Sequence, residues 1–219
     1  MSVIPDWYFF VLISLVISVV WIKLIYPKFL TNYFSSALSY QIAHKIYNET
    51  GLTGKRVGLT LDIIYLITGA LFLYNLFHFF ALSPFNLSGI RLLLLSLSAL
   101  VFFILLRLLL MYLVSILFHQ NKIISEFLFH FYLYNKMLGI LLIPFLFFIP
   151  YTEGILQEVI VYVGIIAVIF VYLFKLVRVI LFLLKNVIFI FYLFLYLCVL
   201  EIVPFMVIIK FLLSLEQGS

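Results

Sequence analysis

Long apolar runs dominate the sequence, and short stretches between them carry most of the polar and charged residues. A helix needs about 20 apolar residues to cross the ~30 Å hydrocarbon core of a bilayer. Strands of a membrane barrel would show short segments of alternating polarity, and these runs are too long and continuous for that. We therefore predict an all-α polytopic transmembrane helical bundle. It has about six spans, at residues 7–25, 58–80, 92–118, 123–150, 154–173 and 187–209.

The fourth run is the least uniform of the six. Its purely apolar part, residues 137–150, is short for the hydrocarbon core. Extension back to residue 123 reaches the required length, but it brings in Glu126, His130, Asn135 and Lys136. The segment therefore either crosses fully or is re-entrant, and a re-entrant segment would reverse the orientation of everything after it.

Two of the connections have a helical pattern of their own. Residues 29–47 place an apolar side chain at every fourth position, which predicts an amphipathic helix lying on the cytoplasmic leaflet and ended by Gly51 and Gly54. Residues 175–186 carry three cations at helical spacing. That stretch is either a second surface helix or an extension of the fifth span.

The composition excludes a soluble protein. Of 219 residues, 68% are hydrophobic and only 10% are charged, whereas soluble domains carry about 25% charged residues. We therefore expect a single integral membrane domain over residues 1–219. The one cysteine, Cys198, excludes an internal disulfide and any site built from several cysteines.

The net charge of +5 points to lipid and not to nucleic acid, because the cations flank the apolar runs. The candidates for contact with anionic headgroups are Lys55, Arg56, Lys175, Arg178 and Lys185. Cytoplasmic loops retain Lys and Arg. Both termini are therefore predicted to face away from the cytoplasm, which is the periplasmic side if the membrane is a bacterial inner membrane.

Three ionisable residues fall inside the predicted spans: Asp62, Arg107 and Glu201. Such groups cost roughly 2.5–3.5 kcal/mol each on insertion scales and usually pair with one another. Glu201 matches Arg107 better by depth, whereas Asp62 matches it better by proximity in the sequence. These residues form a structural ion pair that fixes helix register, part of a proton or ion path, or a contact with a partner subunit.

The standard catalytic motifs are absent from the sequence, including H-E-x-x-H, G-x-S-x-G and the phosphate-binding loop. A haem would need two histidines at one depth, and only His119 and His130 share a level. Together with Lys122 and Glu126 they are more typical of a solvated helix face. We expect no metal, no cofactor and no enzymatic activity.

Two stretches resemble an uncharacterised family of multi-pass inner-membrane proteins from Bacteroidetes-type bacteria. They are YLYNKMLGILLIPF at residues 132–145 and FYLFLYLCVLEIVPFMVIIKFL at residues 191–212. The resemblance implies a bacterial inner-membrane protein and no particular activity. The residues that match the motifs of that family are Asn135, Lys136, Gly139, Pro144, Glu201, Pro204 and Lys210.

These features favour a non-enzymatic accessory or scaffold subunit of a larger envelope complex, with other membrane proteins as partners. The alternative is a small transporter or proton-coupled channel that uses Arg107, Glu201 and Asp62. A membrane enzyme that acts on lipid ranks third, because it would need a polar pocket at headgroup depth and none of the motifs supports one.

Overall fold

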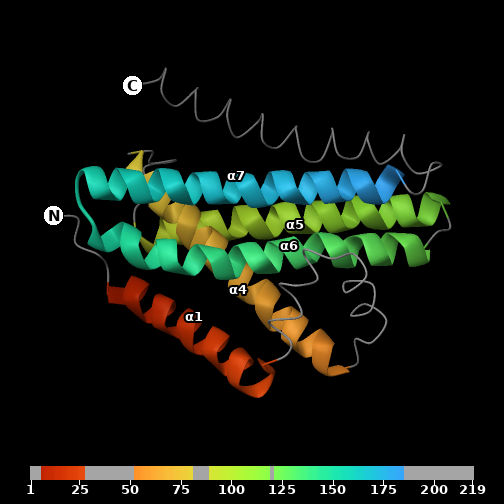
Figure 1. Cartoon of the computed structure of the whole chain (residues 1–219), viewed down its shortest axis with the longest axis horizontal. Helices are drawn as coiled ribbons and strands as arrows, with labels where there is room; N and C mark the ends of the chain where they lie inside the picture. Colours follow the sequence, from red (N-terminus) through yellow and green to blue (C-terminus); the bar gives the residue numbers. More distant parts are fainter. Residues whose placement is uncertain (1–5, 28–51, 81–88, 119–120, 185–219) are drawn as a thin grey trace. The chain divides into compact units, whose positions relative to one another are not determined.

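The computed structural model describes residues 6–27, 52–80, 89–118 and 121–184, and every element within them is helical (Figure 1). The elements are α1 (Asp6–Ile25), α4 (Leu52–Phe79), α5 (Ile90–Phe118), α6 (Asn121–Phe148), the short 3-10 helix η2 (Ile149–Tyr151) and α7 (Ile155–Leu184). The all-α prediction is confirmed for these residues. The predicted amphipathic helix at 29–47 and the predicted sixth span at 187–209 lie outside them.

Among the residues that the structure describes, four helices are long and apolar enough to cross a membrane. The qualifying segments are Trp7–Ile25 of α1, Arg56–Phe79 of α4, Tyr132–Tyr151 of α6 with η2, and Ile155–Arg178 of α7. In α5 the described side chains form an apolar stretch over Ile90–Leu106. These helices are consistent with a membrane protein.

The helix ends differ from the predicted bounds by more than two residues at two places. α4 begins at Leu52 and not at residue 58, so Gly54 lies in its first turn and does not end a preceding helix. α7 continues to Leu184, so the basic stretch after residue 174 extends this helix as far as the structure describes it and is not a separate surface helix. Hydropathy marks the part of a helix suited to hydrocarbon, whereas the backbone hydrogen bonds continue into the polar flanks.

Inter-residue contacts divide the chain into two units, Met1–Leu173 and Phe174–Ser219, with the boundary inside α7. The helix contacts described below all belong to the first unit.

Successive helices of the first unit run in opposite directions. The connections after α4, α5 and α6 are short, so each helix returns along the one before it. α4 and α6 consequently run in the same direction. Two contacts confirm this, because Asp62 and Tyr65 of α4 meet Lys136 and Gly139 of α6 in the same order.

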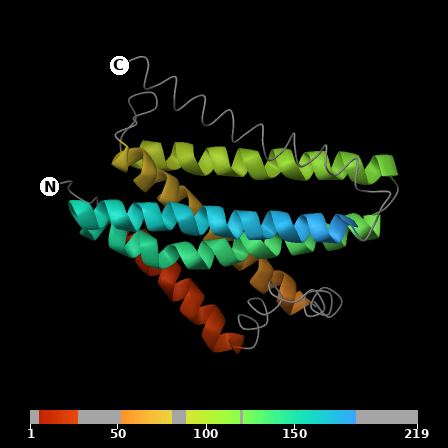
Figure 2. The same cartoon turned by 45° about the horizontal axis from the view of Figure 1, so that its top comes forward.

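α4 is the central helix of the first unit. It contacts α1, α5 and α6, and half of its apolar segment is buried. In the view of Figure 2, α7 crosses in front of α4. A Cβ at Gly164 of α7 would lie 3.1 Å from the ring of Phe72 of α4 and 3.7 Å from the ring of Phe145 of α6. The core is built from the facing sides of these helices, with Leu12, Leu61, Leu71, Leu142, Leu146 and Val161 almost completely buried.

The outward faces of the helices are strongly apolar. Phe10 and Leu24 of α1 are 70% and 74% exposed, and Ile155 of α7 is 81% exposed. Only 17% of the apolar segment of α7 is buried. Soluble monomers rarely expose large continuous apolar patches, so these faces suit a hydrocarbon surrounding.

Candidate functional site

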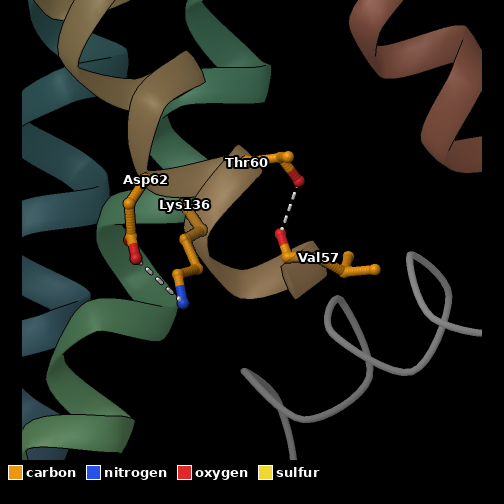
Figure 3. Close-up of polar contacts among 4 residues, drawn as sticks. All are labelled: Val57, Thr60, Asp62 and Lys136. Atoms are coloured by element: carbon orange, nitrogen blue, oxygen red, sulfur yellow. Dashed lines mark hydrogen bonds and ion pairs between the residues drawn. The ribbon is translucent and has the colours of Figure 1, made fainter. Parts of the chain in front are cut away.

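An ion pair joins α4 to α6. The Nζ of Lys136 lies 3.4 Å from Oδ2 of Asp62 (Figure 3). The lysine side chain is 11% exposed, and the aspartate side chain is 36% exposed. The ammonium is therefore enclosed between the helices, whereas part of the carboxylate remains accessible.

The parallel course of α4 and α6 explains how these two residues meet. Asp62 lies about 15 Å along α4 from Leu52, and Lys136 lies about 22 Å along α6 from Asn121. Both residues therefore lie at one level, more than two turns inside their helices. A charge in such a setting is costly when alone, and the pairing offsets that cost.

Directly beside the ion pair, the two helix backbones approach closely at Gly139. A Cβ at this position would lie 2.7 Å from Cα of Tyr65, closer than any real Cβ contact allows. Small residues let membrane helices approach one another in this way. Gly139 follows Lys136 by three residues, so the close approach and the ion pair share one face of α6.

Two motif positions of the fourth run, Lys136 and Gly139, lie at the α4–α6 contact. Asn135 is buried as well. Pro144 lies inside α6, on its exposed side, and does not end the helix. Glu201, Pro204 and Lys210 lie outside the described residues.

A second polar contact joins α1 to both α4 and α6. The hydroxyl of Tyr8 donates to the carbonyl oxygen of Leu146 at 3.0 Å, and Nδ2 of Asn75 donates to the same hydroxyl at 2.8 Å. Nδ2 of Asn75 also donates to the carbonyl of Leu71 at 2.9 Å. Tyr8 is 1% exposed and Asn75 is 8% exposed, so both are buried among apolar neighbours.

The sequence of α6 explains why the Leu146 carbonyl is available. In a helix this carbonyl would accept a hydrogen bond from the N–H four residues later, and that residue is Pro150. Proline has no N–H, so it leaves the carbonyl without its helical donor. The tyrosine of α1 supplies the missing hydrogen bond.

The remaining predicted site residues are placed as follows. Arg107 belongs to α5, but its side chain is outside the described part of the structure, so its pairing with Glu201 or Asp62 stays a prediction. Lys55 and Arg56 lie near the start of α4, with Arg56 exposed. Lys175 is buried and Arg178 is half-buried, whereas Lys185 lies beyond the described residues. Contact of these five cations with headgroups stays a prediction.

Sequence reasoning missed two features of this arrangement. It did not pair Asp62 with Lys136, because hydropathy gives the depth of a residue but not which helix lies beside it. It also gave no role to Tyr8 and Asn75. Two features of the sequence could have pointed to this contact. Asn75 is an asparagine inside an apolar run, and Pro150 follows Leu146 by four residues and so removes the helical donor to its carbonyl.

Chemically, the arrangement fixes helices to one another. The ion pair and the hydrogen-bonded tyrosine each join residues far apart in the chain, on different helices. They lie near opposite ends of α4, with Asp62 and Asn75 about 20 Å apart along the helix axis.

Comparison with known proteins assigns the chain to a family. No curated protein and no solved structure matches the chain. A family model matches residues 8–212, which covers every helix described above except the first two residues of α1. The chain therefore belongs to the family described as Domain of unknown function (DUF4271).

Proposed function

We propose that the chain is a multi-pass inner-membrane protein that acts as a non-enzymatic accessory or scaffold subunit of a larger bacterial envelope complex. One observation carries the proposal: polar side chains of different helices pair with one another and so join those helices. Asp62 pairs with Lys136 between α4 and α6, and Tyr8 bonds to Asn75 and Leu146 from α1. This use of polar groups suits a rigid structural subunit.

The proposed topology has six spans and a cytoplasmic interfacial helix at residues 29–47. The long apolar segments and exposed apolar faces support it. A full crossing by the fourth span is favoured over a re-entrant segment, because α6 is one continuous helix of 28 residues, about 42 Å long. That length exceeds the ~30 Å core.

The proposed orientation places the N-terminus of the chain in the periplasm. Tyr8 near the start of α1 meets Asn75 near the end of α4, so these two helices run in opposite directions. The end of α1 with Lys23 therefore lies on the same side as the start of α4 with Lys55 and Arg56. The start of α6, with Lys122, is on that side too. Cations accumulate on the cytoplasmic side of inner-membrane proteins. The opposite ends carry Glu153 and Glu158.

Partner subunits are proposed to bind the exposed apolar faces within the bilayer. Purification of the full chain from native membranes into lipid nanodiscs, with a cleavable tag, tests this directly. We expect other membrane proteins to co-purify in fixed stoichiometry. A tagged, unrelated multi-pass protein extracted from the same membranes controls for carry-over. A monomer with no specific companion would contradict the proposal.

The alternative function is a small transporter or proton-coupled channel that uses Asp62, Arg107 and Glu201. The observation in its favour is that the carboxylate of Asp62 is 36% exposed although it lies inside an apolar segment. Reconstitution of the Asp62→Asn and Glu201→Gln variants in proteoliposomes separates the two functions. If the chain is a scaffold, neither the unmodified chain nor the two variants should give an ion flux above that of empty vesicles. A flux present in the unmodified chain and lost in either variant would favour the transporter.

A further inference from the structure

The attachment of α1 depends on groups at the end of α6. In hydrocarbon, apolar side chains gain little by leaving lipid for another helix, so hydrogen bonds and close packing decide which helices associate. α1 carries an exposed apolar face that includes Phe10, Ile17 and Trp21. Its other face packs into the core with Leu12, Leu15 and Ile22. Its polar contact with the other helices is made by Tyr8, whose hydroxyl bonds to Asn75 and to the carbonyl of Leu146.

That carbonyl is available because residue 150 is proline. A residue with an N–H at this position could donate to Leu146 from within the same helix. Tyr8 would then have to share the acceptor. Another carbonyl at this end of the helix also accepts a hydrogen bond from a side-chain hydroxyl. The hydroxyl of Thr152 donates to the carbonyl of Phe148 at 3.0 Å.

We infer that Pro150 creates the docking site for the N-terminal helix, by freeing the Leu146 carbonyl to accept the hydroxyl of Tyr8. Tyr8 is thus a positioning residue that holds the start of α1 against the ends of α4 and α6. The inference rests on the bilayer location in the proposed function and does not depend on a partner subunit.

The chain contains a natural probe of this docking. Its two tryptophans, Trp7 and Trp21, both lie in α1. Trp7 packs edge-on against Tyr74 of α4, with ring centroids 5.6 Å apart, and is partly buried. Trp21 is 65% exposed. Separation of α1 would therefore expose Trp7 to lipid, while Trp21 is already exposed.

The experiment measures quenching of tryptophan fluorescence by brominated acyl chains during a temperature scan of the full chain in bilayers. A Trp21→Phe background isolates Trp7, and a Trp7→Phe background isolates Trp21. Tyr8→Phe, Pro150→Ala and the double variant are compared in the first background. Loss of one hydrogen bond changes the ratio of docked to separated α1 by about fivefold.

We expect Tyr8→Phe to lower the temperature at which Trp7 becomes accessible, and to lower it less than half as much when residue 150 is alanine. Pro150→Ala alone is expected to lower that temperature with Tyr8 intact, which keeps the test valid even if Tyr8→Phe fails to fold. The inference would be overturned if Tyr8→Phe lowered this temperature equally with proline and with alanine at residue 150. It would also be overturned if Tyr8→Phe caused no shift with Pro150 present. Failure of brominated lipid to quench Trp21 would instead overturn the bilayer location itself.

Discussion

Lys136 of α6 holds its ammonium 3.4 Å from the carboxylate of Asp62 on α4, and α5 separates these two helices along the chain. The contact therefore fixes a neighbour relationship between parallel helices that the order of the chain alone does not dictate. Gly139, one turn further along α6, lets the backbones approach at the same place. Ion pair and close packing together define one register between α4 and α6.

Exchange of the two charges tests this register. Lys136→Met should lower the free energy of unfolding by about 1–3 kcal/mol, because it leaves the Asp62 carboxylate inside an apolar segment without its cation. Asp62→Lys alone should be at least as harmful, because it places two cations together. The double exchange, Asp62→Lys with Lys136→Asp, should recover more than half of the loss. Unfolding in mixed micelles of rising denaturing detergent measures all three.

Arg56 provides the matched control for this series, because it is exposed near the start of the same helix. Arg56→Met should change the free energy of unfolding by less than about 0.5 kcal/mol. If the doubly exchanged protein were no more stable than the single variants, the pair would not be a register contact.

The close approach at Gly139 gives a second prediction. Gly139→Ala should destabilise the protein by about 1–3 kcal/mol, because the new methyl group meets the backbone of Tyr65 and the helices must separate. Gly69→Ala is the comparison: its Cβ would meet only the end of the Leu100 side chain at 3.1 Å, and that side chain can move. In detergent, the unfolding temperature of Gly139→Ala should be lower than that of Gly69→Ala. The reverse order would contradict the geometry.

Much of the fold follows from hydropathy alone. The first predicted span, residues 7–25, differs from α1 by one residue, and residues 92–118 differ from α5 by two. These bounds are sharp because polar residues border the apolar runs. The start of α4 and the length of α7 were less predictable, because Gly54, Lys175 and Arg178 fit into helices that extend past the apolar segment.

The contacts between helices were not predictable in the same way. Asp62 stands out as an acid inside an apolar run, but nothing in one sequence says whether α5 or α6 lies against it. Lys136 stands out equally and matches a family motif. Only the parallel arrangement of α4 and α6 brings the two together.

The pairing of Asp62 with Lys136 favours Glu201 as the acid that neutralises Arg107, since depth already makes it the better match. Arg107→Glu should reduce the amount of folded protein in membranes severalfold, because like charges would face each other. Glu201→Arg in the same chain should restore most of it. Quantitative immunoblotting of membrane fractions measures this. Lack of rescue, with both single variants impaired, would show that the two residues are not partners.

Cysteine mapping of the two helix ends tests the central claim most directly, namely that the helices cross the inner membrane with their basic ends in the cytoplasm. In a Cys198→Ser background, single cysteines replace Arg56 at the start of α4 and Ser83 in the following connection. An impermeant maleimide added to intact spheroplasts should label position 83 and should reach position 56 only after the membrane is opened. Labelling of position 56 in sealed spheroplasts, or recovery of the chain in the soluble fraction without detergent, would contradict the account.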